Sequence, residues 1–389
     1  MSGRDLFCQP RRYRRGAALT LVFASVLAAG AATGSLPGTG EYEQAPDVTR
    51  TAAAAVSRND VADAAAEAMA DGKSPVEAAE RAVSRSGDRW GAVYSEGEYE
   101  EFTEALDGRY TGVGLWARRG RDGRIKVAGV RSGSPAEDAG IREGDRLRSV
   151  DGHVVDGRPV TEVLALLRGD AEDAAVGSSV RLGLERGART WHVTLRRASL
   201  STEPVTVRGL RGGVTVIKVA AFTKGSGDRV RGAVLRARSG SGIILDLRGN
   251  SGGLVTEAVT AASAFLDGGL VATYDVEGDQ RALHARPGGD TEKPLVALVD
   301  GGTMSAAELV TGALQDRGRA VVVGARTFGK GSVQMPSRLP DGSVAELTVG
   351  HYRTPAGRGV DGRGITPDLE ADGEALKRAE TVLSGLGRQ

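Results

Sequence analysis

Two serines and one lysine are the residues of this chain whose types and surroundings suggest catalysis. Ser251 lies in the run GNSGG, directly after an apolar stretch. Ser305 follows a second apolar stretch and two glycines, in DGGTMSAAELVTGALQD, and Lys330 lies between two glycines in FGKGSVQ. A serine hydroxyl becomes a good nucleophile when a neighbouring base removes its proton, so each candidate serine needs a base nearby.

The GNSGG run is the sequence that surrounds the nucleophilic serine of trypsin-fold proteases, where a histidine base and an aspartate accompany it. None of the four histidines shows a pattern expected of that base; they are His153, His192, His284 and His351. The region around Ser251 also alternates predicted strands with predicted helices, whereas the trypsin fold is all β. We therefore interpret Ser251 as a turn residue and not as a nucleophile.

Lys330 is the stronger candidate for a base, and it favours Ser305 as the nucleophile. Ser305 is predicted at a helix N-terminus, where free N–H groups and the positive dipole end stabilise negative charge. A serine that only caps the helix has the same context. Lys330 decides between the two roles because its glycine neighbours and the preceding buried strand can keep it out of water, which favours the neutral amine. That amine can take the proton of Ser305, and Gln334 is placed to orient it.

The residues after position 198 predict an α/β layered domain that holds these groups. Near-continuous apolar runs indicate buried strands, and the segments between them have helical periodicity. The predicted strands are 214–219, 241–247, 295–299 and 320–324, and the predicted helices are 226–238, 256–265 and 305–315. Alternation of this kind is typical of α/β layers.

The residues from 109 to 197 change to short strands and turns, with a predicted helix at Val160–Arg168. Their run GSPAEDAGIREGDRLRSVDG resembles a PDZ domain. Such a domain binds an extended C-terminus as an added strand and holds its carboxylate with the N–H groups of a Gly-rich loop. Here that loop is Gly112, Val113, Gly114 and Leu115, and we expect the apolar end of the bound tail beside the predicted helix.

The bulk composition excludes a nucleic-acid-binding protein. Lys and Arg total 51 against 50 Asp and Glu, and aromatic residues make up 4%, so neither a basic field nor a stacking surface is expected. Arginines at 11–15 precede the apolar run 17–32, which contains a small-x-small site and is typical of a secretory signal or an uncleaved anchor. The only cysteine, Cys8, precedes that run, so cysteine catalysis, thiolate metal sites and disulfides are excluded from the exported part.

Four segments together resemble the carboxyl-terminal processing, or tail-specific, proteases. They are LDLRGNSGG, DGGTMSAAELVTGALQD, FGKGSVQ and GHYRTPAGRGVDGRGITPD. The resemblance implies an exported Ser-Lys endopeptidase with a PDZ domain before a ClpP/crotonase-like core. It assigns the nucleophile to Ser305, the general base to Lys330 and the supporting glutamine to Gln334, with Asp316 in a structural or supporting role.

The same resemblance gives the GNSGG run a role for its backbone. The family segment is Arg-Gly-Asn-x-Gly-Gly, in which x is often proline, so no hydroxyl is needed at Ser251. The amides of Gly252 and Gly253, together with that of Ala306, are expected to form the oxyanion hole, with Gly252 as the first choice. Losing one such donor typically costs ~10²–10³ in rate. The resemblance also implies that the PDZ domain can gate the site, with Arg168 as the candidate relay.

The sequence thus predicts a multidomain α/β (α+β) protein that acts as an exported serine endopeptidase, secreted or anchored at the outer face of the cytoplasmic membrane. It binds apolar C-terminal tails of protein substrates, needs no cofactor or metal, and can be a homo-oligomer. A non-catalytic tail-binding adaptor is the alternative, and a crotonase-like acyl-CoA enzyme would lack the export signal and the PDZ domain. The predicted parts are 1–32 (signal or anchor), 33–46 (linker), 47–108 (helical region, pinned by Trp90 and Tyr94), 109–197 (PDZ), 198–375 (catalytic) and 376–389 (tail).

Overall fold

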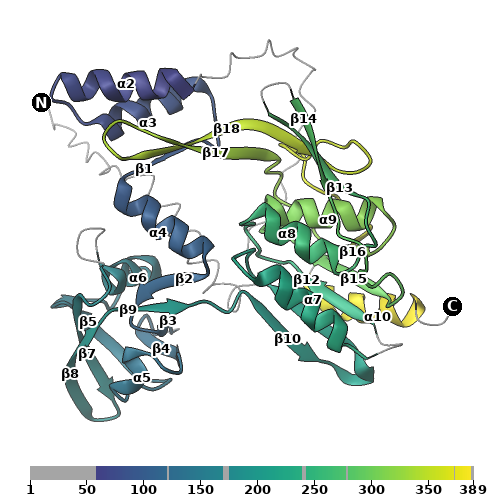
Figure 1. Ribbon diagram of the computed structural model, residues 1–389. Coiled ribbons are helices and arrows are strands. Elements are labelled where there is room, and N and C mark those ends of the chain that lie inside the picture. Colours follow the sequence, from purple (N-terminus) through teal and green to yellow (C-terminus); the bar gives the residue numbers. More distant parts are fainter. Residues whose placement is uncertain are drawn as a thin grey trace, which may run out of the picture.

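The computed structural model describes residues 58–120, 122–169, 175–238, 242–276, 279–371 and 373–386. The predicted signal or anchor and the linker after it lie outside these residues. Helices and sheets are combined in three parts, which we call the core, the PDZ-like domain and the cap (Figure 1). The predicted fold class, a multidomain mixture of α and β, is confirmed. None of the described helices has both the length and the apolar character needed to cross a membrane.

The core is built on a six-stranded sheet in the order β10-β11-β12-β15-β16-β19. All neighbouring pairs are parallel except β10 and β11, which are antiparallel at one edge. Its strands are β10 (Val205–Gly209), β11 (Thr215–Val219), β12 (Ile243–Asp246), β15 (Leu295–Val299), β16 (Val321–Gly324) and β19 (Leu369–Glu370), and the short 3-10 helix η1 (Arg211–Gly213) precedes β11.

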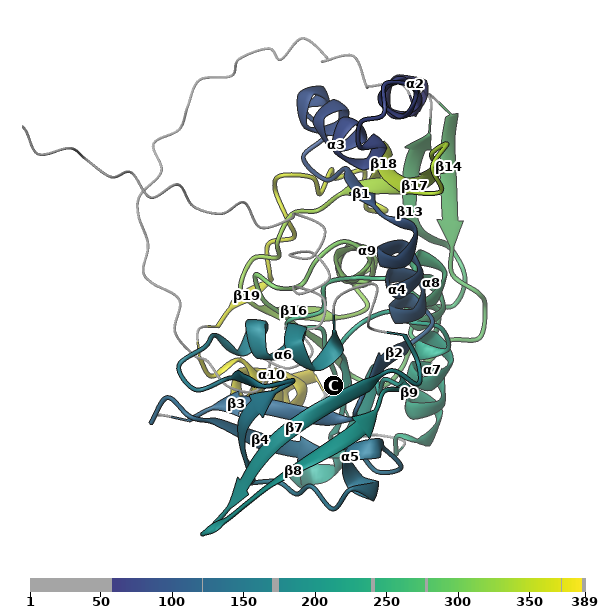
Figure 2. The same ribbon diagram turned by 90° about the vertical axis from the view of Figure 1, so that its left-hand side faces the viewer.

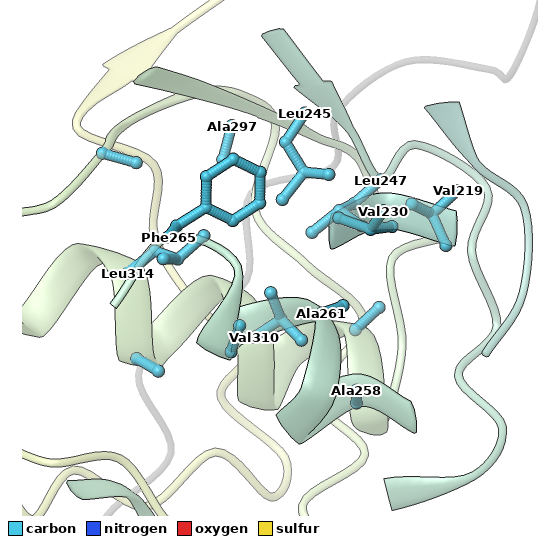
Figure 3. Close-up of a cluster of buried hydrophobic side chains, with 14 of the residues drawn as sticks. Val219, Val230, Leu245, Leu247, Ala258, Ala261, Phe265, Ala297, Val310 and Leu314 are labelled. Carbon is cyan, nitrogen blue, oxygen red and sulfur yellow. The ribbon is translucent and has the colours of Figure 1, made fainter. Parts of the chain in front are cut away.

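Helices cover both faces of this sheet, which explains why its central strands are apolar without interruption. One face packs against α7 (Ser226–Arg236), α8 (Val255–Ser263) and α9 (Ala306–Asp316), and the other against α10 (Ala375–Leu386). Alternate strand residues serve the two faces: Leu245 and Ala297 join the first cluster, whereas Ile244 joins the second. Figure 3 shows the first cluster, in which Phe265, Val310 and Leu314 come from the helical side.

The PDZ-like domain is a second sheet, in the order β3-β4-β5-β7-β8 with β6 paired to β5. Its elements are β3 (Leu115–Arg119), β4 (Ile125–Val130), α5 (Pro135–Asp138), β5 (Arg146–Val150), β6 (His153–Val154), α6 (Val160–Arg168), β7 (Ser179–Arg186) and β8 (Arg189–Arg196). A two-stranded ladder of β2 (Arg109–Gly112) and β9 (Ala198–Ser201) joins the entry and exit of the domain. The domain is therefore an insertion with its own buried cluster.

The cap combines the N-terminal end of the described chain with two hairpins from later in the sequence. Its sheet has the order β1-β18-β13-β14, and β17 pairs with the other side of β18. Helices α2 and α3 pack on this sheet, and α4 runs from the cap toward the PDZ-like domain (Figures 1 and 2). The elements are α2 (Arg58–Ala70), α3 (Pro75–Ser86), β1 (Ala92–Tyr94), α4 (Glu96–Leu106), β13 (Leu270–Val276), β14 (Asp279–His284), β17 (Ser332–Arg338) and β18 (Val344–Arg353).

The predicted N-terminal helical region is thus not an independent unit. Buried Val83 and Val93 pack in one cluster with Ala345 and Leu347 of β18, so the helices share their core with a hairpin far along the chain. Helical periodicity identified α2 to α4, but it carries no information about this partner.

Candidate active site

Ser305 lies on a sharp turn between β15 and α9, in a strained backbone conformation. Its φ is 54°, and Asp151 is the only other non-glycine residue with positive φ in the described chain. Such a conformation costs about 1–3 kcal/mol and persists only where the surroundings hold it. The Ser305 N–H donates to Glu308 Oε2 at 2.9 Å, and its carbonyl accepts from the hydroxyl of Tyr352 at 2.8 Å. The turn therefore presents a serine side chain at the N-terminus of α9.

Glu308 connects this turn to the loop that carries Lys330. Its side chain is fully buried and accepts four hydrogen bonds. Besides the Ser305 N–H, the donors are Thr327 Oγ1 at 2.5 Å, Gly329 N at 2.8 Å and Lys330 N at 2.9 Å. Burial raises the pKa of this carboxyl, while the hydrogen bonds from Thr327 and the backbone act in the opposite direction. Glu308 thus fixes the backbones of both candidate catalytic residues to one side chain.

Tyr352 of β18 makes a second connection between the same two residues. Its hydroxyl lies 2.8 Å from the carbonyl oxygen of Ser305 and 2.9 Å from that of Lys330. Burial raises the pKa of Tyr352 well above its ordinary value, so the hydroxyl stays protonated and can donate. Sequence reasoning missed both connecting residues. The capping-box spacing Ser-x-x-Glu could have identified Glu308, whereas nothing local identifies Tyr352.

The amine of Lys330 faces the cap. Its Nζ lies 5.3 Å from the centroid of the Trp90 ring, and Phe328 packs against that ring at 5.7 Å. Burial lowers the pKa of Lys330, and the carboxylates of Glu346, Asp88 and Asp361 oppose this shift. Among the hydrogen bonds of the described residues there is none between Ser305 Oγ and Lys330 Nζ. Glu308 and Tyr352 hold the backbones of the two residues together, and catalytic hydrogen bonds between side chains are often long without substrate.

Gln334 contacts Trp90, and no hydrogen bond joins its side chain to the Lys330 amine in the described residues, in contrast to the direct orientation that the sequence predicted. Its Nε2 donates to the carbonyl oxygen of Trp90, and the indole N–H of Trp90 donates to Asp361 Oδ1 at 3.1 Å. The physical reason is that Trp90, from the segment between α3 and β1, lies against the lysine amine. The expectation that Trp90 pins the N-terminal region to a neighbour thus describes only part of its contacts.

The glycine turn after β12 lies against the nucleophile turn. A Cβ on Gly252 would come within 3.0 Å of Met304 O and of Ser305 Cβ, so only glycine permits this approach. Asn250 braces the turn, because its Nδ2 donates to Val219 O at 3.0 Å and its Oδ1 accepts from the Gly252 N–H at 2.8 Å. Ser251 makes no hydrogen bond through its side chain among the described residues.

The occupied N–H of Gly252 contradicts the choice of this residue as the first oxyanion donor. In the described residues, neither the N–H of Gly253 nor that of Ala306 has an acceptor. The geometry therefore favours Gly253 and Ala306 as the pair of donors, with Gly252 providing the close approach.

The other predicted site residues lie away from this centre. Asp316 is at the end of α9, where its carboxylate pairs with Arg358 and accepts from Ala356 N at 2.8 Å, so its contacts are with the segment that follows β18. The loop from Gly112 to Leu115 lies at the start of β3, and the N–H groups of Val113 and Gly114 have no acceptor in the described residues. Arg168 ends α6, where burial lowers its pKa and the charge of Glu101 on α4 raises it.

The part of the chain that the structure describes contains no set of three or more His, Cys, Asp or Glu side chains arranged to hold a metal ion.

Similarity to known proteins extends over both the core and the PDZ-like domain. Residues 213–371 match peptidase family S41, and residues 126–186 match the PDZ domain. The chain is 32% identical over 290 residues to the carboxy-terminal processing protease CtpA of Bacillus subtilis, which covers 73% of this chain and 61% of that protein. It is 34% identical over 310 residues to the chloroplastic carboxyl-terminal-processing peptidase 3 of Arabidopsis thaliana, with 74% and 58% covered.

A solved structure is similar over a larger share of its length. The photosystem II D1 C-terminal processing protease aligns with a TM-score of 0.50 and 30% identity, over 80% of this chain and 86% of that one. By comparison, the chain spans about three fifths of the length of the two curated relatives.

Proposed function

The chain belongs to the carboxyl-terminal processing proteases of peptidase family S41, and on that premise we propose that it is an exported serine endopeptidase with a Ser-Lys dyad. The observation that carries the proposal is the strained turn at Ser305, tied through Glu308 to the backbone of Lys330. A helix-capping serine would not require a positive φ or a buried carboxylate that also holds a lysine loop.

The reaction follows from the chemistry of these groups. Ser305 Oγ attacks the carbonyl carbon of a peptide bond while its proton passes to the neutral amine of Lys330. The oxygen of the tetrahedral intermediate accepts hydrogen bonds from the N–H groups of Gly253 and Ala306. The C–N bond then breaks, and the proton on Lys330 passes to the leaving amine. Water, deprotonated by Lys330, hydrolyses the acyl-enzyme and restores Ser305.

The PDZ-like domain selects the substrate in this proposal. The C-terminal carboxylate of a protein binds the unpaired N–H groups of Val113 and Gly114, and its apolar end residues lie between β3 and α6. Arg168, partly buried at the end of α6 and influenced by the charge of Glu101 on α4, is the proposed relay from the bound tail to the active site. Export rests on the sequence of residues 11–32.

Alanine variants test the dyad directly. We expect Ser305→Ala and Lys330→Ala to reduce cleavage of a long synthetic peptide with an apolar free C-terminus to background, because each removes a group that forms or transfers a bond. Cleavage products are measured by mass spectrometry, and circular dichroism checks that each variant is folded. Amidation of the peptide's C-terminus should raise KM through loss of the tail contact.

Ser251→Ala is the matched control, since it removes a serine hydroxyl from the same site. It should retain nearly all of the wild-type kcat/KM. Substantial activity of Ser305→Ala, or an inactive and folded Ser251→Ala, would contradict the proposed dyad.

A further inference from the structure

Three carboxylates act on the charge of the Lys330 amine, and they come from three separate segments. Glu346 lies on β18, Asp88 lies between α3 and β1, and Asp361 lies in the loop between β18 and β19. Glu346 has the largest electrostatic effect of the three. None of them was identified by the sequence motifs.

Two of these carboxylates are already used by the surrounding structure. Asp88 accepts from the N–H groups of Trp90 and Gly91, and from both the N–H and the hydroxyl of Thr348. Asp361 accepts from the indole N–H of Trp90 and from Gly331 N, each at 3.1 Å, and its Oδ2 lies 3.8 Å from His351 Nε2. Their negative charge is therefore divided among several donors that hold the cap to the Lys330 loop.

Glu346 differs because its carboxylate accepts no hydrogen bond within the described part of the chain. On β18 it lies opposite Ala92 of β1 and Pro336 of β17, and neither of these side chains can donate. Ala345 and Leu347, on either side of it, pack with the cap helices. Because side chains alternate along a strand, Glu346 lies on the opposite face, which it shares with Gln334, the residue that holds Trp90.

We propose, on the basis of the proposed function, that Glu346 is a positioning residue for the general base Lys330. Its carboxylate is the one whose charge is available to the ammonium form of that lysine. It acts through the lysine and does not touch the substrate. In the absence of Glu346, the groups of the cap around the Lys330 amine would be the ring of Trp90 and two carboxylates that already accept hydrogen bonds from other donors.

The electrostatic consequence has a definite sign. Burial lowers the pKa of Lys330 and the charge of Glu346 raises it; burial raises the pKa of Glu346 and the charge of Lys330 lowers it. Catalysis needs the neutral amine, so activity rises with pH through the lysine pKa. Removing the Glu346 charge lowers that pKa further, so the acid limb of the kcat/KM profile moves to lower pH.

The other charged or titratable groups around Lys330 and Glu346 are the same in the wild type and in a Glu346 variant. They are Asp88 and Asp361 beside the amine, Arg89 over the Trp90 ring at 4.3 Å, Glu308 beneath the lysine backbone, His351 at Asp361, Tyr94 and Tyr99 beside Glu346, Glu98 beside Tyr94, and Arg338 beside Tyr99. A shift between wild type and a Glu346 variant therefore reports on Glu346.

The first test is the pH dependence of kcat/KM in the full-length protein. We expect Glu346→Gln to move the acid limb down by about one pH unit, whereas Glu346→Asp keeps it near the wild-type position. Glu100→Gln, which removes the same charge from an exposed site on α4, should leave the profile unchanged. An acid limb of Glu346→Gln that coincides with wild type, or moves to higher pH, overturns the proposal.

The second test does not depend on catalysis. In a Ser305→Ala background, acetylation of Lys330 by acetic anhydride is followed against pH by mass spectrometry, with and without Glu346→Gln. The pH at which labelling is half-maximal should fall by about as much as the acid limb of kcat/KM when the Glu346 carboxylate is removed. An unchanged pH of half-maximal labelling overturns the role of Glu346. Residual cleavage by the Ser305→Ala protein would instead overturn the proposed dyad, so the two failures are distinguishable.

Discussion

At the scale of single residues, the positions of Ser305 and Lys330 depend on a buried carboxylate that takes no part in the proposed bond-forming steps. Glu308 Oε2 accepts from the N–H groups of Ser305 and Lys330, and Oε1 accepts from Thr327 and Gly329. Three of the four partners are backbone N–H groups, which can only donate, so both oxygens of the side chain must accept. An ionised carboxylate meets this requirement and an amide does not.

Glu308→Gln is therefore expected to damage both folding and catalysis. Its NH₂ group would face at least one backbone N–H group, and a buried donor left without an acceptor costs about 1–3 kcal/mol of unfolding free energy. The Ser305 turn would also lose part of the contact that holds its strained φ, so kcat/KM should fall by about 5- to 150-fold for the same cost. Urea unfolding and steady-state kinetics measure the two effects.

Glu257→Gln separates the structural effect from the catalytic one. Glu257 also accepts from two backbone N–H groups, those of Gly225 and Gly227, but it lies on α8 outside the site. This variant should lose stability while keeping the wild-type kcat/KM per folded molecule. Equal losses of kcat/KM in the two variants would show that Glu308 has no special relation to the site.

How much of the site could be predicted depends on the sequence distance between its members. Ser305 and Lys330 were identified because strand ends, glycines and a helix start are local signals. Trp90 belongs to the same site, but it lies 271 residues before its hydrogen-bond partner Asp361 in the sequence. Glu346 is recognisable only once the register of β1, β18 and β17 is known, and no local pattern specifies that register.

At the scale of elements, the sheet strands and helices of the core were predicted because their patterns are strong. Both faces of β12 and β15 are buried, so their sequences are continuously apolar, and the three predicted helices that follow match α7, α8 and α9 to within two residues at each end. The cap sheet was not predicted, since β17 and β18 bury only one face and complete their core with α2 and α3.

The glycine turn after β12 gives a prediction at this scale. Gly252 has φ of 101°, and an added Cβ would lie 3.0 Å from Ser305 Cβ and 3.2 Å from Ala306 N. Gly252→Ala should push the turn away from the nucleophile and misalign the oxyanion donors, lowering kcat/KM by about 10²–10³-fold, the usual cost of losing one donor. Steady-state kinetics on the folded variant measure it.

A second glycine controls for the backbone strain itself. Gly268 has φ of 63°, but an added Cβ there would meet nothing within 4 Å. Gly268→Ala should therefore cost stability and leave kcat/KM close to wild type. If Gly252→Ala is equally active, the turn does not take part in oxyanion binding.

At the scale of the whole molecule, the cap completes the active site of the core. Trp90 belongs to the N-terminal part of the chain, yet its ring covers the Lys330 amine and its backbone is held by Gln334 of β17. The helices α2 and α3 hold this segment through the cluster they share with β18. The surroundings of the Lys330 amine are thus set by residues from the N-terminal segment and from the segments after β16.

Removing the Trp90 ring should change the pH dependence of the enzyme in the direction opposite to Glu346→Gln. The largest influence on the Lys330 pKa is burial, which lowers it. Trp90→Ala admits water to the amine and moves its pKa back toward the ordinary value, so the acid limb of kcat/KM should shift to higher pH by about one unit. The lost cation–π contact acts the other way and is worth about 0.5–2 kcal/mol, or roughly 0.4–1.5 pK units, so a downward shift would mean that it outweighs burial.

Trp191→Ala is the matched control, because Trp191 also has cations over its ring, Arg186 at 5.3 Å and Arg189 at 5.5 Å, but belongs to β8 of the PDZ-like domain. Its acid limb should stay at the wild-type pH. An unshifted profile for Trp90→Ala would show that the ring has no net effect on the pKa of Lys330, and it would contradict the idea that the cap sets the charge state of the amine.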